Sequence, residues 1–171
     1  MQLKLAKTLW GVAEAGEPCS WDSLFSRIKA EGFDAVEAIP LTWRLDAPLF
    51  KSLLAKHSLS LICQIHTSGE VGGSGEYVYM GSNKVHDHLA SFVKLTGEAK
   101  ALGAVLINSH SGHDSWGSGD KAINFLKTAL RVEAALGVPV VHETHRQRLF
   151  SNPYTTAELL SMPELGALRH G

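Results

Sequence analysis

The sequence lacks the long apolar run that a membrane helix or a secretion signal would require. No stretch approaches the ~18 consecutive apolar residues that a membrane-spanning helix needs. The amino-terminal segment has some apolar residues, but Lys7 interrupts them and no signal-peptide core or cleavage site follows. We therefore interpret this segment as a strand, and we expect a cytoplasmic protein with no membrane partner.

Cysteine and clustered positive charge are also scarce. The two cysteines, Cys19 and Cys63, lie far apart and match no metal-binding or redox spacing, which is typical of reduced thiols in a cytosolic protein. The formal net charge is −1 and the sequence has no basic run. Because phosphate contacts need lysine and arginine, a nucleic-acid partner is not favoured.

Glycine-rich nucleotide motifs are absent as well. No Gly-x-Gly-x-x-Gly follows the first expected strand, which weakens the case for a dinucleotide-binding domain. No phosphate loop that ends in Gly-Lys-Ser or Gly-Lys-Thr is present either.

What the sequence does contain is a regular alternation of strand-like and helix-like segments. The alternation repeats every ~30 to 35 residues, which indicates βαβ units and a parallel sheet. The expected strands cover 3–10, 33–39, 59–67, 104–110 and 138–145. The expected helices cover 21–31, 46–57, a segment through Leu89 that ends at Gly103, 120–136 and a short segment that begins near Thr155.

Local signals mark the ends of these helices. Ser20 and Asp46 are the expected amino-terminal caps, and Gly32, Gly103 and Gly137 are expected to end three helices. Longer loops follow the third, fourth and fifth strands, the first of them a Gly- and Ser-rich loop over 68–83. TIM barrels place their active sites at this end of the strands.

Polar side chains recur on one face of four successive strands, near the carboxyl ends. Because side chains alternate along a strand, residues two apart share a face. If that face is the interior of a barrel, the polar side chains converge on one cavity. They are Glu37 on the second strand, Gln64 and His66 on the third, Asn108 and His110 on the fourth, and Glu143 and His145 on the fifth.

Several of these residues also have a structural interpretation. A single strand-end histidine such as His66 is more often a core or rim residue, and Glu37 could bind a backbone amide or an arginine. His142 lies on the opposite face, where a structural role is expected, and His113 and Asp114 could line the site or face solvent. The histidines expected to be exposed are His57, His86, His88 and His170.

Glu143 carries the strongest functional signal. A carboxylate at the end of a valine-rich buried strand costs several kcal/mol unless it is paired or bound to a metal. Histidines on the neighbouring strands make a divalent metal the simplest explanation. Carboxylate and imidazole ligands favour Mn²⁺, Zn²⁺, Co²⁺ or Fe²⁺ over Ca²⁺, and the cofactor that we predict is a divalent metal (Mn, Zn, Co or Mg).

Three segments resemble the xylose isomerase-like TIM-barrel family of sugar isomerases and epimerases. Residues 107–112 read INSHSG and residues 141–146 read VHETHR, and 32–37 read GFDAVE, which is similar to the second-strand motif of the family. The resemblance implies one partial (β/α)8 barrel domain over 1–171. A full barrel takes about 250 residues, so we expect strands six to eight to be missing.

The resemblance also implies roles for individual residues. Glu143 matches the metal ligand on strand five, which in the epimerases is also one of two carboxylates that move a proton beside a carbonyl group. His145 would orient Glu143 or act beside it in catalysis, and Arg146 would meet an anionic group of the substrate. The remaining substrate-binding residues would be Glu37, His66, Asn108 and His110.

Three functional interpretations stay open. The first is a metal-dependent isomerase or epimerase of a sugar or sugar phosphate, impaired in this form because the other metal ligands would come from strands six to eight. The second is a non-catalytic fragment that needs a partner chain, since exposed sheet edges favour self-association. The third is an endonuclease IV-like hydrolase of abasic DNA, in which His66 and His110 would bind metal.

Overall fold

The computed structural model describes residues 3–10, 12, 20–68 and 82–171, which form a six-stranded parallel sheet with helices between the strands. The strands are β1 (Ala6–Thr8), β2 (Ala35–Ala38), β3 (Ser60–His66), β4 (Leu106–His110), β5 (Val140–His142) and β6 (Arg169–His170). The helices are α1 (Trp21–Ala30), α2 (Pro40–Trp43), α3 (Ala47–Lys56), α4 (Val85–Leu102), α5 (Asp120–Leu136) and α6 (Pro153–Leu160). Cys19 and most of the expected loop over 68–83 lie outside the described residues.

The predicted fold class is confirmed, because parallel strands alternate with helices in the order of a partial TIM barrel. The strands follow one another across the sheet from β1 to β6, so no strand crosses over another. The short helix α2, which begins at Pro40 directly after β2, was not expected. The expectation that strand six is missing is wrong, because β6 pairs in parallel with β5.

The fifth strand is shorter than the sequence indicated. It ends at His142, so Glu143 and His145 follow the strand rather than lie within it. The backbone N–H of Glu143 nevertheless donates to the carbonyl of Ser109 on β4 at 3.0 Å, which continues the ladder by one residue. Glu143 therefore keeps the orientation that strand alternation predicts.

The predicted helix ends are mostly confirmed. Asp46 caps α3 by accepting a hydrogen bond from the backbone of Leu49 at 3.0 Å. Ser20 occupies the cap position of α1 but makes no side-chain cap bond. Gly103 and Gly137 end α4 and α5 in the left-handed conformation, with φ of 93° and 69°, which only glycine adopts without strain.

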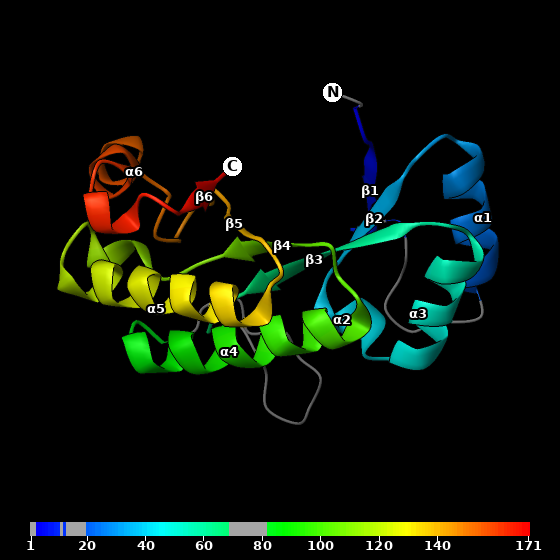
Figure 1. The fold of residues 1–171 in the computed structure, drawn as a ribbon, viewed down its shortest axis with the longest axis horizontal. Coiled ribbons are helices and arrows are strands. Elements are labelled where there is room, and N and C mark those ends of the chain that lie inside the picture. Colours follow the sequence, from blue (N-terminus) through cyan, green and yellow to red (C-terminus); the bar gives the residue numbers. More distant parts are fainter. Residues whose placement is uncertain (1–2, 11, 13–19, 69–81) are drawn as a thin grey trace.

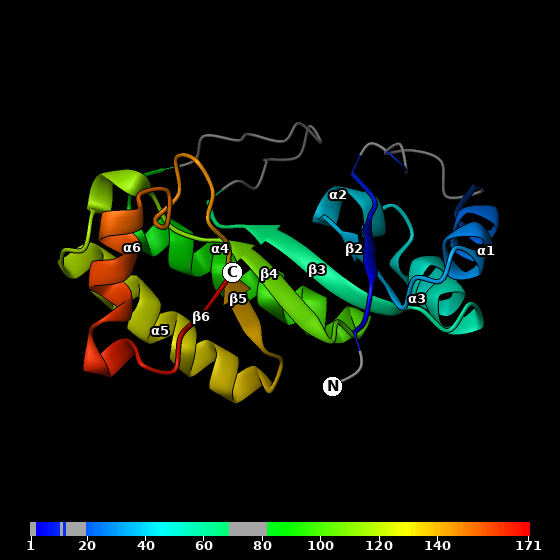
Figure 2. The same ribbon diagram turned by 90° about the horizontal axis from the view of Figure 1, so that it is seen from above.

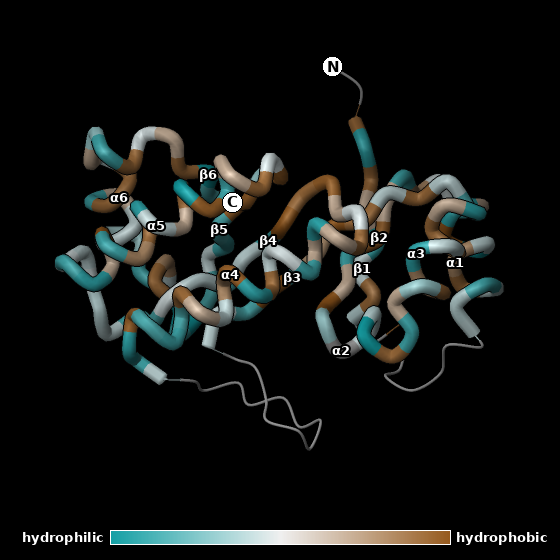
Figure 3. The backbone as a smooth tube through the Cα atoms, turned by 60° about the horizontal axis from the view of Figure 1, so that its bottom comes forward, coloured by the Kyte–Doolittle hydropathy of each residue, from teal (hydrophilic) through white to brown (hydrophobic). Residues whose placement is uncertain are grey.

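The helices cover one face of the sheet, and the polar strand ends lie on the other. Helices α4 and α5 run side by side along the sheet, and α1 and α3 pack together beside β1 and β2 (Figures 1 and 2). The strand residues that face these helices are apolar and buried, as Val36, Ile65 and Ile107 show. Apolar and polar residues alternate along the helices, and a continuous apolar stretch lies beside the labels of β3 and β4, whereas β6 is hydrophilic (Figure 3).

Aromatic rings and a buried thiol fill the core between sheet and helices. Trp21 and Phe50 meet edge to face at 5.0 Å, and Phe50 meets Phe25 in the same way at 5.3 Å. Burying a large apolar side chain stabilises the fold by about 1.5–3 kcal/mol. Cys63 is a free thiol in this core, and burial raises its pKa. Within the described ranges, no helix is long and apolar enough to span a membrane.

Candidate active site

Asn108 joins the two carboxylates of the site. Its side-chain amide donates to Glu37 Oε1 at 2.9 Å and to Glu143 Oε2 at 2.5 Å. Glu37 lies on β2 and Glu143 directly follows β5, whereas Asn108 lies on β4, which is between β3 and β5 in the sheet. One nitrogen atom thus holds both acidic groups at the carboxyl ends of the strands, where the sequence predicted that they would converge.

His110 also contacts Glu143. Its Nε2 lies 2.8 Å from Glu143 Oε2 and 2.9 Å from the side-chain nitrogen of Gln64. The oxygen of the Gln64 amide accepts a hydrogen bond from the indole N–H of Trp10 at 2.8 Å. Because an indole N–H can only donate, this bond determines which end of the Gln64 amide faces His110.

Three histidine rings lie in a row beside the carboxylates. His66 and His110 are register partners on β3 and β4, and their ring centroids lie 4.1 Å apart with nearly parallel planes. The ring of His145 lies 4.5 Å from that of His110. The Nδ1 of His145 donates to the carbonyl of Arg146 at 2.7 Å, since a carbonyl oxygen only accepts.

Burial keeps two of these rings neutral. Desolvation, with smaller contributions from His110 and Arg148, lowers the pKa of His66 to about 2. Burial also lowers the pKa of His110, although the neighbouring Glu143 carboxylate opposes part of this change. At neutral pH, His66 and His110 therefore act as hydrogen-bonding groups and not as cations.

The structure brings together six of the seven residues predicted for the site. Glu37, Asn108 and Glu143 form the carboxylate group, and the three histidine rings adjoin it. Arg146 is the exception. Its side chain is exposed, and among the described residues it is the backbone carbonyl of Arg146 that accepts a hydrogen bond from His145.

Arg148, two residues further along, was missed by sequence analysis. It is only 4% exposed, and its guanidinium group donates to the backbone carbonyl of Thr67 at the end of β3, at 2.9 Å. The loop after β5 therefore turns inward at Arg148 and outward at Arg146. Nothing in the spacing of the two arginines could have distinguished them.

The prediction that His88 is exposed is wrong. This residue of α4 is 1% exposed because its helix face packs toward the end of β3. Its Nε2 donates to the carbonyl of Ser82 at 2.6 Å, which leaves Nδ1 to accept from the hydroxyl of Thr67 at 2.7 Å. The same hydroxyl accepts from the backbone N–H of Gly112 at 2.8 Å.

The other histidines outside the cluster are placed as follows. His57 is half-buried rather than exposed, and its ring lies 2.6 Å from a carboxylate oxygen of Asp22. His86 and His170 are exposed, as expected. His113 is half-buried, and its Nδ1 accepts from the backbone N–H of Ser115 at 3.2 Å. His142 is buried on the helix-facing side of β5, where its Nδ1 lies 2.7 Å from the Ser111 hydroxyl.

Comparison with known proteins shows which fold this is. No protein-family model matches the chain, and no curated protein matches it. Solved structures do. The probable 3-DHS dehydratase AsbF from Bacillus anthracis is 14% identical with a TM-score of 0.65, over 98% of this chain and 61% of that chain. The chain has the fold of the xylose isomerase-like TIM barrels.

Two further solved structures agree with this assignment. The 3-keto-D-glucoside 4-epimerase YcjR from E. coli is 14% identical with a TM-score of 0.64, over 99% of this chain and 67% of that chain. A xylose isomerase-like TIM barrel protein from Mycobacterium smegmatis, in complex with magnesium, is 16% identical with a TM-score of 0.61. That match covers 92% of this chain and 60% of that chain. This chain thus spans about three fifths to two thirds of the length of these TIM-barrel proteins.

The described part of this TIM-type sheet supplies an incomplete set of metal ligands. Among the residues that the structure describes, no three His, Cys, Asp or Glu side chains gather in a way that could hold a metal ion. The Oε2 atom of Glu143 is already engaged by Asn108 and His110. Glu143 could provide one ligand, but zinc sites use three or four protein ligands.

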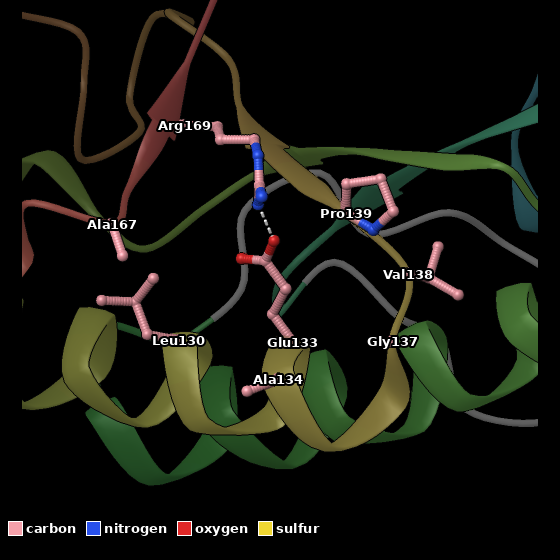
Figure 4. A pocket seen from close by; sticks show the side chains of 8 residues that line it. All are labelled: Leu130, Glu133, Ala134, Gly137, Val138, Pro139, Ala167 and Arg169. Atoms are coloured by element: carbon pink, nitrogen blue, oxygen red, sulfur yellow. Dashed lines mark hydrogen bonds and ion pairs between the residues drawn. The ribbon is translucent and has the colours of Figure 1, made fainter.

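A pocket of about 490 Å³ lies away from this cluster, between α5 and the last two strands. Glu133 and Arg169 form an ion pair across it (Figure 4). Val138 and Pro139 line it just before β5, at the opposite end of the strand from Glu143. The remaining lining residues are Leu130, Ala134, Gly137 and Ala167, so this pocket offers apolar surface and no catalytic group beyond the ion pair.

Proposed function

We propose that this site moves a proton at the carbon beside a carbonyl group, as in the isomerisation or epimerisation of a sugar or sugar phosphate. The observation that carries the proposal is the position of Glu143, which Asn108 and His110 hold through the same carboxylate oxygen. The epimerase and the other TIM-barrel structures with this fold support it. Because the chain spans only part of their length, the activity of a whole enzyme belongs to the proposal.

Glu143 is the proton acceptor that this geometry favours. Its side chain is 34% exposed, whereas that of His110 is 4% exposed, so a substrate can reach the carboxylate but not the ring beneath it. A general base must come within hydrogen-bond reach of the proton that it removes. Because Oε2 is engaged by the protein, the other carboxylate oxygen is the one available for this role.

The proton transfer can be followed atom by atom. The free oxygen of Glu143 takes the proton from carbon, and the electron pair of the C–H bond forms the carbon–carbon double bond of an enediolate as charge moves onto the carbonyl oxygen. In isomerisation, Glu143 then delivers this proton to the neighbouring carbon. In epimerisation, Glu143 keeps the proton, and a second acid on the opposite face of the substrate donates another proton to the same carbon. His145 is half-exposed and its Nδ1 is tied to the backbone, so its Nε2 is the group proposed to relay protons between substrate oxygens.

The other side chains of the site would bind the substrate and the cofactor. Glu37, His66, Asn108 and His110 would contact or support the bound sugar, and Arg146 would meet an anionic group at the rim. A divalent metal, with Glu143 as one ligand, would polarise the carbonyl group and lower the barrier to enediolate formation. The described residues provide only this carboxylate, so the steps above use side chains of the chain alone.

Exchange of carbon-bound hydrogen with solvent deuterium tests the proposal. The chain is incubated in D₂O with D-fructose, D-fructose 6-phosphate or a 3-ketoglucoside, with and without Mn²⁺, and deuterium at the carbon beside the carbonyl is followed by NMR. We expect Glu143→Gln to reduce the exchange rate by at least ~10²-fold, the scale of a lost general base. Glu31→Gln, which changes an exposed carboxylate at the end of α1, serves as the matched control and should leave the rate unchanged. Equal rates for wild type and Glu143→Gln would remove Glu143 from this role.

A further inference from the structure

Gln64 connects the most exposed tryptophan of the chain to the catalytic pair. Its side chain is 8% exposed on the polar face of β3, and both ends of its amide have partners. The oxygen accepts from Trp10 at 2.8 Å, and the nitrogen lies 2.9 Å from His110 Nε2. Sequence analysis placed Gln64 on the correct face but assigned it no role, and it did not single out Trp10.

The orientation of this amide follows from chemistry alone. The indole N–H of Trp10 is a donor only, so it requires the oxygen of Gln64 and directs the NH₂ group toward His110. The NH₂ group in turn can only donate, and Glu143 Oε2 lies 2.8 Å from the same ring nitrogen. One nitrogen atom of His110 therefore meets both an amide donor and a carboxylate acceptor, so Gln64 and Glu143 compete for it.

Trp10 is placed to sense a ligand. Its side chain lies directly after β1 at one end of this chain of contacts, and the residue is 49% exposed. The other three tryptophans, Trp21, Trp43 and Trp116, are at most 6% exposed. A molecule bound against the half-exposed indole would contact the residue whose N–H holds the Gln64 amide beside His110.

We propose that Gln64 is a positioning residue that couples Trp10, at the accessible end of the site, to the His110–Glu143 pair. The proposal rests on the proposed function for its catalytic consequence, because a sugar bound against Trp10 would then influence the residue that holds the base. The contacts themselves, from the Trp10 indole through the Gln64 amide to the His110 imidazole, do not depend on which reaction the site performs.

Tryptophan fluorescence tests the relay without a substrate. Because Trp10 is the accessible tryptophan, quenching by acrylamide reports mainly on this residue, and Trp10→Phe identifies its share of the signal. Loss of a neutral hydrogen bond raises the ratio of indole that is not bonded to residue 64 to indole that is bonded to it by roughly five-fold. We therefore expect Gln64→Met to raise the quenching constant clearly. Ile62→Met, on the same strand and face, is the matched control and should not change it. Quenching in Gln64→Met that equals the wild type would overturn the proposal.

A substitution at the far end tests the coupling itself. His110→Phe keeps a ring between His66 and His145 but removes the nitrogen that faces Gln64. It should change the quenching of Trp10 in the wild-type background and have no further effect in Gln64→Met. The same change in both backgrounds would overturn the coupling.

A second variant keeps the test decisive if Gln64→Met does not fold. In Gln64→Glu one carboxylate oxygen still accepts from Trp10, and the other can accept from the Nε2–H of His110. Trp10 should therefore stay protected and should still respond to His110→Phe, and a lost response would contradict the proposal. These measurements need no turnover. They therefore test the positioning role of Gln64 even if the chain shows no deuterium exchange.

Discussion

Acid should destabilise this protein partly through His88, and replacing His88 should remove that part. The ring is buried and its hydrogen bonds require the neutral form, since Nε2 donates to Ser82 while Nδ1 accepts from Thr67. Burial lowers the pKa of His88 to about 4, below the ordinary value of 6.5. A proton added to Nδ1 would also end the donation from the Thr67 hydroxyl.

The sign and size of the effect follow from proton linkage. Between pH 6.5 and pH 4 the unfolded chain binds a proton at His88 and the folded protein does not, so the free energy of unfolding falls as pH decreases. Above pH 6.5 both states are neutral at this residue and the contribution is fully present. For these two pKa values, lowering the pH from about 7.5 to about 5 costs about 2 kcal/mol.

Urea unfolding at both pH values measures this contribution. His88→Gln has no titrating ring, yet its amide can still donate to Ser82 and accept from Thr67. Its loss of unfolding free energy between the two pH values should therefore be about 2 kcal/mol smaller than in the wild type. His86→Gln removes an exposed histidine on the same helix and should show the wild-type loss. An identical acid-dependent loss in His88→Gln and the wild type would refute this reasoning.

Two further predictions concern backbone groups at the site. Arg148→Met should lower the free energy of unfolding by about 1–3 kcal/mol, because it leaves the buried Thr67 carbonyl without its guanidinium donor; a change within ~0.5 kcal/mol, the size of an ordinary surface substitution, would contradict this. Gly112→Ala should destabilise by about 1–3 kcal/mol, because φ is +66° and the new methyl group would lie 2.9 Å from a buried indole. Gly97→Ala, in a helix with open space around the site, is the control and should stabilise by about 0.5–1 kcal/mol; equal effects of the two glycine substitutions in urea unfolding would argue against the steric explanation.

The fold class followed from local patterns that are repeated along the chain. Strand-like and helix-like segments alternate, and parallel pairing of consecutive strands is what such alternation requires. Strand alternation also placed Glu37, Asn108 and Glu143 on one face, because the side-chain period of a strand depends only on its own backbone. The ends of the elements were less certain, as the early end of β5 at His142 shows.

The sequence by itself determined the first five strands, which of their residues share a face, and hence that acidic, amide and imidazole groups meet at one end of the sheet. Only the tertiary structure decided that His88 is buried while His86 is exposed, and that Arg148 turns inward while Arg146 does not. His88 meets Thr67 across 21 residues of sequence, and Arg148 meets it across 81. Such contacts depend on how helices and loops dock against the sheet, and no local spacing encodes that arrangement.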